Sequence, residues 1–266
     1  WGMTFHSKKI IKFYPSPLPA RHIFAIFAGN KPHRVMSQTL LYDEPFPILL
    51  DADPHPEVVL IHPTDRRETT AIDRLTAHIR AATSRPFAFA AIEIADWVGQ
   101  LAPWPDAILA PHADAGHGAT DTLAHIETTL LPLLSRRFGP LPCILGGYSL
   151  AALFALWAST VSPSFAAVAA ASPSVWMERW PQHLQNHAPQ TAQVYLSLGD
   201  LEEKTRHPGF ARIGTNIRTT RDELVRVLGE DRCVLEWNKG NHFAHVTERT
   251  ARAFAWCMTH LHTFSS

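Results

Sequence analysis

The sequence has no excess of charge of either sign. Over 266 residues, 24 lysines and arginines are matched by 24 aspartates and glutamates, and no long basic run occurs. Nucleic acids and anionic membrane surfaces select proteins with clustered positive charge. We therefore expect neither as a partner of this chain.

Cysteine is scarce and odd in number. Cys143, Cys233 and Cys257 are not spaced as metal ligands are, and two of them lie in apolar surroundings. Free buried thiols in a reducing compartment explain this pattern better than a disulfide framework does. We expect a cytoplasmic protein. No leader is visible at the start of the sequence, and one already removed would leave no trace.

Long apolar runs are also missing. Residues 138–177 contain no Asp, Glu, Lys or Arg, but glycines and prolines divide that stretch into short pieces. A helix that spans a membrane needs about 20 consecutive apolar residues. We expect no membrane span, and the uncharged stretch predicts the centre of a packed core.

What the sequence does contain is an alternation of strand and helix patterns, without internal repeats. Strand-like runs are found at 58–62, 87–94, 142–148, 165–172, 193–199 and 233–237. Helix-like segments are found at 65–82, 120–138, 149–160, 213–228 and 246–261. This alternation predicts one mostly parallel sheet with helices on both faces.

The N-terminal part is less distinct. Residues 9–14 and 22–27 are typical of short strands, and the proline-interrupted segment 42–57 predicts loop and edge structure. We expect a single domain over residues 1–266, in which 1–57 supply N-terminal strands and loops.

A short motif stands where one predicted strand meets the following helix. It reads Gly147-Tyr148-Ser149-Leu150-Ala151, close to the pattern G-x-S-x-G, with alanine in place of the second glycine. In a strand–turn–helix context this pattern projects a nucleophilic serine above the carboxyl end of a sheet. The plainer interpretation is a serine that caps a buried helix. The surrounding sequence decides between the two.

A serine hydroxyl needs a base, and the base needs an orienting acid. On this architecture the chain order is serine, acid, histidine, each after a successive strand. Asp200, Glu202 and Glu203 follow the strand-like run 193–199, and His242 and His245 follow 233–237. The order favours Ser149 as a nucleophile. We expect His242 as the base because it lies directly after the last strand, whereas His245 lies at the start of a helix.

Four segments, "GGYSLAALFALW", "YLSLGDLEEKTRHP", "EWNKGNHF" and "WVGQLAPWPD", resemble the branch of the α/β-hydrolases that includes esterase D, enterochelin esterases, feruloyl esterases and mycolyltransferases. The resemblance covers roughly residues 58–260, which it implies to be the catalytic core. It implies a single-domain α/β-hydrolase fold, a serine esterase activity on a small-molecule ester, and no cofactor. It leaves open whether the chain forms a homo-oligomer.

The resemblance also implies residue roles. The acid of the family lies three residues past the strand-end glycine, which is Glu202 counted from Gly199, with Asp200 and Glu203 as alternatives. The oxyanion hole requires two backbone N–H groups. One is expected from Leu150, after the nucleophile. The other is expected from Thr64 or a later residue, because Pro63 has no N–H.

The loop "PHADAGHG" contains His112, Asp114 and His117, which invite a metal hypothesis. Their spacing matches no established zinc pattern. We expect no metal, and interpret the loop as part of the pocket rim, together with Trp97 and Trp104.

Three functions fit these residues. The first is a serine hydrolase that cleaves a carboxylic ester or thioester through an acyl-enzyme on Ser149. The second is an acyltransferase that uses the same acyl-enzyme, and the third is a binding protein that kept the fold without the chemistry. The joint presence of serine, acid and histidine argues against the third. The sequence does not separate the first two.

Overall fold

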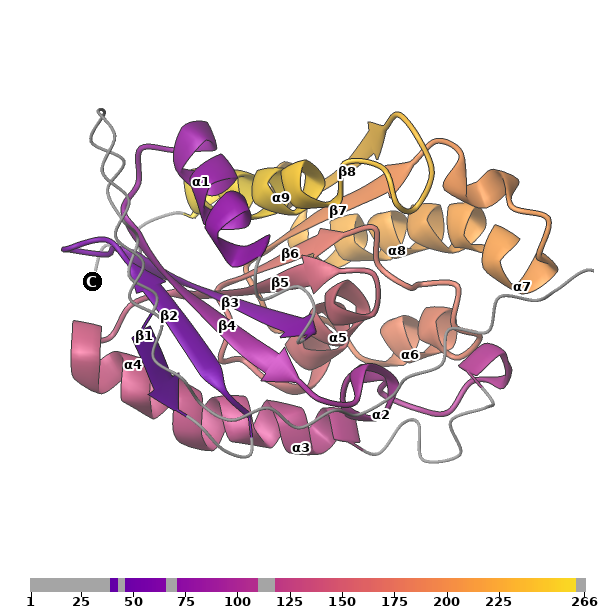
Figure 1. Cartoon of the computed structure of the whole chain (residues 1–266). Helices are drawn as coiled ribbons and strands as arrows, with labels where there is room; N and C mark the ends of the chain where they lie inside the picture. Colours follow the sequence, from indigo (N-terminus) through magenta and orange to yellow (C-terminus); the bar gives the residue numbers. More distant parts are fainter. Residues whose placement is uncertain (1–38, 43–45, 66–70, 110–117, 262–266) are drawn as a thin grey trace, which may run out of the picture. The chain divides into compact units, whose positions relative to one another are not determined.

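A computed structural model of the chain describes residues 39–42, 46–65, 71–109 and 118–261 (Figure 1). All of them belong to the second of the two units into which the chain divides, Met36–Ser266. The strands expected at 9–14 and 22–27 lie outside the described residues. The expected domain boundaries therefore stay a prediction.

The described part of the chain forms one sheet of eight strands in the order β1-β2-β4-β3-β5-β6-β7-β8. The strands are β1 (Thr39–Tyr42), β2 (Ile48–Ala52), β3 (Val58–Asp65), β4 (Phe87–Ile94), β5 (Cys143–Tyr148), β6 (Ala167–Ala171), β7 (Gln193–Gly199) and β8 (Cys233–Asn238). β2 pairs antiparallel with both β1 and β4, and every pairing from β4 to β8 is parallel. A sheet of this kind brings the carboxyl ends of β3 to β8 to one edge.

Helices connect the strands. They are α1 (Ile72–Ala82), α2 (Trp97–Leu101), α3 (Gly118–His125), α4 (Leu131–Phe138), α5 (Leu150–Val161), α6 (Trp180–Asn186), α7 (Pro208–Ala211), α8 (Ile213–Leu228) and α9 (Val246–His260). Short helical turns are η2 (Ala107–Leu109), η3 (Ile126–Leu130), η4 (Glu202–Lys204) and η5 (Glu230–Arg232). The η3 turn is π-helical and joins α3 to α4.

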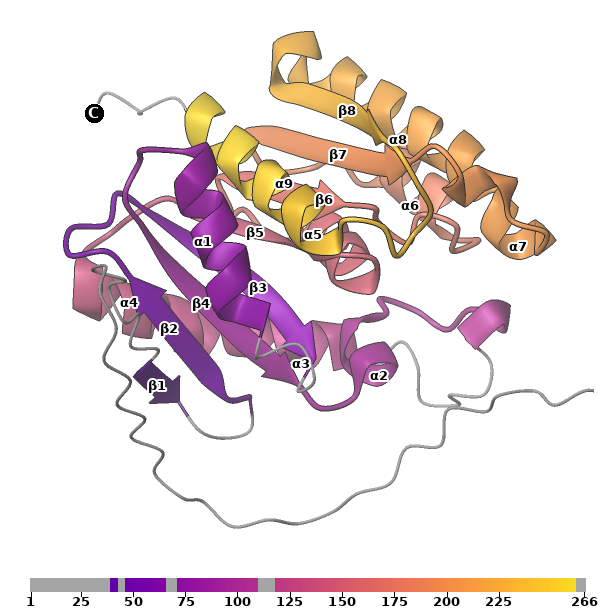
Figure 2. The same cartoon turned by 45° about the horizontal axis from the view of Figure 1, so that its top comes forward.

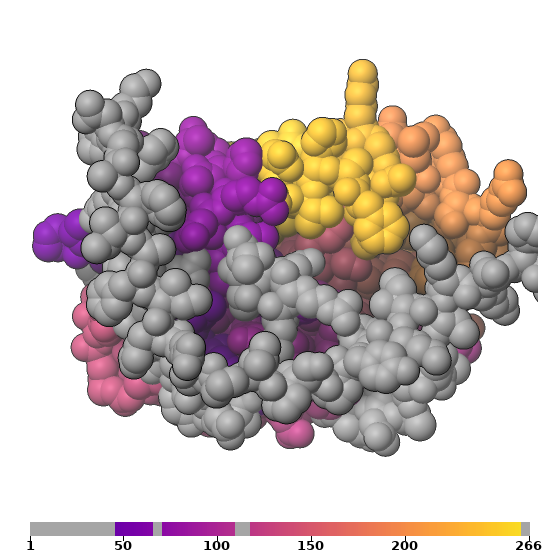
Figure 3. Space-filling model, in the orientation of Figure 1, coloured from indigo at the N-terminus to yellow at the C-terminus, as the bar shows by residue number. Residues whose placement is uncertain are grey.

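The helices form a layer on each face of the sheet. α1 and α9 pack side by side on one face, while α3, α5, α6 and α8 pack on the other (Figures 1 and 2). The surfaces of α1 and α9 also adjoin in the space-filling view (Figure 3). Because parallel strands are joined by helical crossovers, both faces of such a sheet become covered.

The two hydrophobic cores follow from strand alternation. In β3, Val59 and Ile61 face the core under α5, whereas Val58 and Leu60 face the core under α1 and α9. α5 is buried along nearly its whole length, from Leu150 to Thr160. This burial explains why its sequence carries no charged residue. The expected packed centre within 138–177 is thus present.

The expected mostly parallel α/β architecture is confirmed, with three differences in detail. The segment 42–57, expected as loop and edge structure, contains β2, which pairs with β4 over five register positions. The helix expected at 65–82 is observed from Ile72. β3 continues through Pro63 and Thr64 to Asp65, three residues past the end of the strand-like run 58–62.

Pro63 is tolerated in β3 because this end of the strand is paired on one side only. β5 pairs with β3 only at Val59, Leu60 and Ile61, so beyond Ile61 β3 has β4 as its single sheet neighbour. A proline lacks the N–H needed for a ladder on both sides, but it fits where one side of the strand is unpaired.

None of the helices in the described ranges combines the length and apolar character that a bilayer crossing requires.

Candidate active site

Three predicted site residues hang from the carboxyl ends of neighbouring parallel strands. Ser149 follows β5, Glu202 follows β7 in the η4 turn, and His242 follows β8. The order β5-β6-β7-β8 brings these three ends to one edge of the sheet. Ligand sites of open α/β sheets form at this edge.

Ser149 occupies a strained turn between β5 and α5. Its backbone has φ 57° and ψ −116°, a conformation that side-chain-bearing residues rarely adopt. A Cβ on Gly147 would lie 2.6 Å from the Cβ of Ala151, closer than real carbon atoms approach. Alanine at 151 is therefore compatible with the turn because residue 147 is glycine.

The side chains of the three residues form a continuous hydrogen-bonded series. Ser149 Oγ lies 3.0 Å from His242 Nε2, and His242 Nδ1 lies 2.7 Å from Glu202 Oε2. Both distances are within the range needed for proton transfer and orientation. The arrangement allows His242 to accept the proton of the serine hydroxyl while Glu202 holds the ring in place.

The alternative acids have other partners. Asp200 accepts a hydrogen bond from the backbone N–H of Gly240 at 2.9 Å, which ties the β7 loop to the loop that carries His242. Glu203 forms a bidentate ion pair with Arg218 at 2.8 and 3.1 Å. Of the three acidic residues, Glu202 contacts the histidine.

Glu202 is buried among donors. Ser172 Oγ lies 2.6 Å from both carboxylate oxygens, the N–H of Gly199 donates at 2.7 Å, and Arg249 Nη2 lies 2.8 Å from Oε1. Burial by itself raises the pKa of the Glu202 carboxyl, but hydrogen bonds from His242, Ser172 and Arg249 outweigh it and hold the pKa at about 2. Glu202 is thus a carboxylate at neutral pH.

The two histidines of the last loop lie in different environments. His242 is half-buried beside Ser149, and its backbone oxygen accepts a hydrogen bond from the Tyr148 hydroxyl at 2.7 Å. His245 is exposed, adopts a left-handed conformation at the N-terminus of α9, and lines a separate hollow with Trp237 and Glu248.

The expected oxyanion donors lie at the first turn of α5 and the end of β3. Leu150 is the first residue of α5, where N–H groups have no acceptor within the helix. Thr64 is 1% exposed and pairs in register with Glu93 of β4. Asp65, the next residue, lines the pocket that contains Ser149.

A pocket of about 210 Å³ opens in front of the serine. Its described lining residues are His62, Asp65, Trp97, Tyr148, Ser149, His242, Phe243 and Val246. Trp97 is thus at the pocket as expected, whereas Trp104 is buried beside His183 and lines a different hollow. Phe243 is 84% exposed, so an apolar ring stands at the pocket mouth.

His62 lies at the pocket floor but has a structural partner. Its Nδ1 donates to the backbone oxygen of Gly146 at 3.2 Å, and its ring packs against Phe89 and Phe254. Burial lowers the pKa of His62 to about 4, so this ring is neutral at neutral pH.

His112, Asp114 and His117, for which no metal was expected, lie outside the described residues. Within the described ranges, no group of three or more His, Cys, Asp or Glu side chains is arranged to hold a metal ion.

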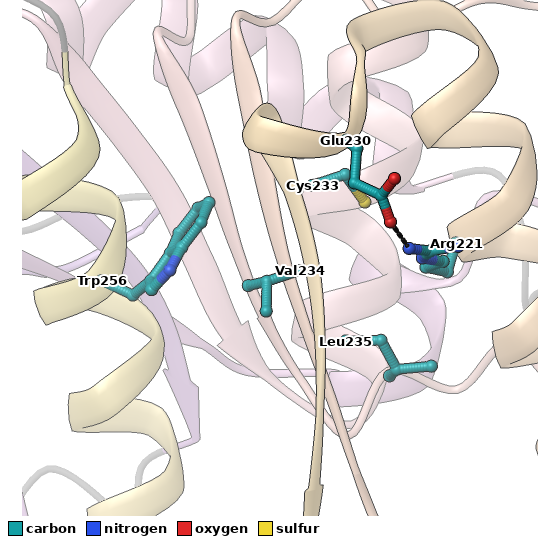
Figure 4. A pocket seen from close by; sticks show the side chains of 6 residues that line it. All are labelled: Arg221, Glu230, Cys233, Val234, Leu235 and Trp256. Atoms are coloured by element: carbon teal, nitrogen blue, oxygen red, sulfur yellow. Dashed lines mark hydrogen bonds and ion pairs between the residues drawn. The ribbon is translucent and has the colours of Figure 1, made fainter.

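Another hollow lies at the sheet edge and shares no lining residue with the serine pocket. Figure 4 shows it around β8, with the ion pair between Arg221 and Glu230 on one side and Trp256 of α9 on the other. None of the predicted site residues lines it.

Sequence reasoning missed three residues of this network. Ser172 and Arg249 contact Glu202, and Tyr148 and Arg249 hold the loop of His242. Tyr148 lies within the serine motif, so the sequence offered a signal for it. Ser172 and Arg249 belong to no motif, and only the folded chain brings them to the acid.

These observations define the class of fold. The sheet order with one antiparallel strand near its start, the turn at Ser149 and the position of the site at the strand ends are those of an α/β-hydrolase fold. No protein-family model and no curated protein matches the sequence.

Solved structures with this fold include two siderophore hydrolases and an enterobactin esterase. Siderophore hydrolase EstA from Aspergillus nidulans has a TM-score of 0.67 at 17% identity, over 89% of this chain and 99% of its own. EstB from the same organism has a TM-score of 0.64 at 17% identity, over 86% and 96%. The enterobactin esterase from Shigella flexneri has 0.62 at 15% identity, over 86% of this chain and 60% of its own. At identities this low, the structural similarity shows a shared fold.

Proposed function

We propose that the protein is a serine esterase that hydrolyses a carboxylic ester or thioester through an acyl-enzyme on Ser149. The observation that carries the proposal is the hydrogen-bonded series Ser149–His242–Glu202, with links of 3.0 and 2.7 Å on a strained turn at the pocket. The esterases among the structures with the same fold support it.

In the first half of the reaction, His242 Nε2 takes the proton of Ser149 as Oγ attacks the ester carbonyl carbon. The negative charge on the carbonyl oxygen is accepted by the N–H of Leu150 and by a second N–H at the end of β3, from Thr64 or Asp65. Collapse of this intermediate breaks the bond between the carbonyl carbon and the oxygen of an ester or the sulfur of a thioester. The alcohol or thiol leaves with the proton that His242 returns.

In the second half, water attacks the acyl-enzyme while His242 again acts as base. Release of the carboxylic acid restores the serine hydroxyl. Throughout, Glu202 stabilises the imidazolium that forms on His242 and fixes its ring orientation. Its low pKa keeps this carboxylate charged at neutral pH.

Covalent labelling tests the nucleophile, and a substrate panel tests the reaction. A fluorophosphonate probe is expected to label Ser149 and no other serine, as mapped by mass spectrometry. Simple p-nitrophenyl esters and enterobactin should then be hydrolysed, and enterobactin is included because one of the structural neighbours is an enterobactin esterase. Transfer of the acyl group to added alcohols in preference to water would instead support an acyltransferase. An unlabelled Ser149 would refute the proposal.

Replacement of the acid by its amide gives a second test. Glu202→Gln is expected to lower kcat by about 10⁴-fold, because the amide no longer stabilises the imidazolium and favours the wrong ring tautomer. The matched control, Glu203→Gln, removes an exposed ion pair with Arg218 and should stay near wild type. Equal losses in the two variants would contradict the role of Glu202.

A further inference from the structure

Arg249 is a fully buried cation next to the proposed active site. It lies in the first turn of α9, its side chain is 0% exposed, and its Nη2 pairs with Glu202 Oε1 at 2.8 Å. The Nε atom has no hydrogen-bond partner among the described residues. A buried ion pair of this kind adds little to stability, because desolvation of the two charges offsets their attraction. Its presence here calls for a role in the site.

The guanidinium joins all three strand-end segments that carry the site. It reaches the β7 segment through Glu202. It reaches the serine segment through Tyr148, whose hydroxyl accepts a hydrogen bond from Nη1 at 2.6 Å. The same hydroxyl donates to the backbone oxygen of His242 at 2.7 Å, and Nη1 also lies 3.5 Å from the backbone oxygens of Asn241 and Ala244.

We propose that Arg249 is a positioning residue of the esterase site, which fixes the loop of His242 through Tyr148 and sets the charge that Glu202 presents to His242. This inference rests on the proposed function. Arg249 touches neither Ser149 nor the pocket, so it acts through the groups that it holds.

The two contacts of Arg249 have separable consequences. The contact with Tyr148 fixes geometry, because the hydroxyl connects the guanidinium to the backbone of His242. Burial raises the pKa of Tyr148 to about 12, so the hydroxyl keeps its proton and its donor role. The contact with Glu202 concerns charge. Arg249 pairs with one oxygen of Glu202, and His242 contacts the other. The positive charge of Arg249 therefore weakens the attraction between the carboxylate and a proton on the His242 ring.

Other groups around His242 also contribute to its electrostatic environment. The titratable or charged side chains that face it or its loop are His62 and Asp65 from β3, Tyr148 from β5, Asp200 and Glu202 from the β7 segment, and Arg249 from α9. Of these, the guanidinium is the cation that contacts Glu202 directly.

The charge effect is tested with Arg249→Met. Without the cation, the Glu202–His242 pair binds a proton more tightly, and the acidic limb of the pH profile of kcat/KM should move to higher pH by about one unit. The pH dependence of fluorophosphonate labelling of Ser149 should move in parallel. Arg80→Met is the matched control, because it removes a guanidinium that pairs with Asp51 and Asp53 away from the site. The control should lower stability without moving the midpoint of the acidic limb of the pH profile.

The geometric effect is tested with Tyr148→Phe and Arg249→Lys. Tyr148→Phe keeps the ion pair between Arg249 and Glu202 but breaks the link to the His242 loop. The kcat should therefore fall by about ten-fold, and the midpoint of the pH profile should stay unchanged. Arg249→Lys retains the charge without the fork, so it should behave like Tyr148→Phe. If Arg249→Met fails to fold, Arg249→Lys still tests the positioning role, because a wild-type kcat in this variant would overturn it.

The outcomes separate the inference from the proposed function. A folded Arg249→Met enzyme with the wild-type midpoint, or Arg249→Lys with wild-type kcat and midpoint, overturns the role of Arg249 while the esterase proposal stands. A wild-type protein that hydrolyses no ester and is not labelled at Ser149 at any pH refutes the esterase proposal and this inference with it.

Discussion

Ser149→Ala is expected to lower the kcat for ester hydrolysis by about 10⁴-fold or more and to abolish fluorophosphonate labelling. The change removes the attacking oxygen. It keeps the Cβ, so the strained backbone at φ 57° is no more costly than before. The hydroxyl is also no helix cap, because it contacts His242 and Ser174 and no backbone N–H of α5. The melting temperature should therefore change little.

Ser174 supplies the matched control. Its hydroxyl lies 3.2 Å from Ser149 Oγ and it is buried in the same region, but it makes no hydrogen bond to His242. Ser174→Ala should keep most of the activity and all of the labelling. Turnover that survives in Ser149→Ala but is lost in Ser174→Ala would show that Ser174, and not Ser149, is the nucleophile.

His242→Ala is expected to have an effect of the same order, about 10⁴-fold in kcat, because Ser149 then has no group to accept its proton. His245→Ala should cost far less, since His245 is exposed and lines a different hollow. The two histidines stand three residues apart in one loop, so the pair controls for damage to the loop itself. Steady-state kinetics of both variants on one p-nitrophenyl ester is the measurement.

If His245→Ala had the larger effect, the base would be His245, three residues further along the chain. Such a result would also leave the contact between His242 and Glu202 without a catalytic reason. In that case the proposed series of hydrogen bonds would describe a structural network, and another base would have to be sought in the pocket.

Local sequence patterns were sufficient for much of the fold. Continuous apolar runs such as 193–199 predict buried parallel strands, and the observed β7 has these bounds. The segment 42–57 misled because its prolines are typical of loops, whereas pairing with β4 and burial of Ile48 and Leu50 place a strand there. Such pairing is a tertiary effect that no local pattern contains.

The site divides in the same way. The serine turn is a local motif with a steric reason, the clash that any Cβ on Gly147 would meet. The choice among Asp200, Glu202 and Glu203 was open from the residues alone, because three acids within four positions are also ordinary for a solvated turn. Arg249 had no signal at all, since an arginine in an amphipathic helix is usually a surface residue, and its burial depends on partners at positions 148 and 202.

The position of β8 has a consequence for how the protein responds to heat. β8 is the last strand of the described sheet and is paired on one side only, with β7, and it carries the loop of His242. Edge strands open at lower free energy than central ones, so their amides exchange with solvent earlier. Ser149 hangs from the central β5. Partial opening at the edge would thus withdraw the proposed base while the proposed nucleophile stays in place, and we expect warming to abolish the proposed activity reversibly before the sheet melts.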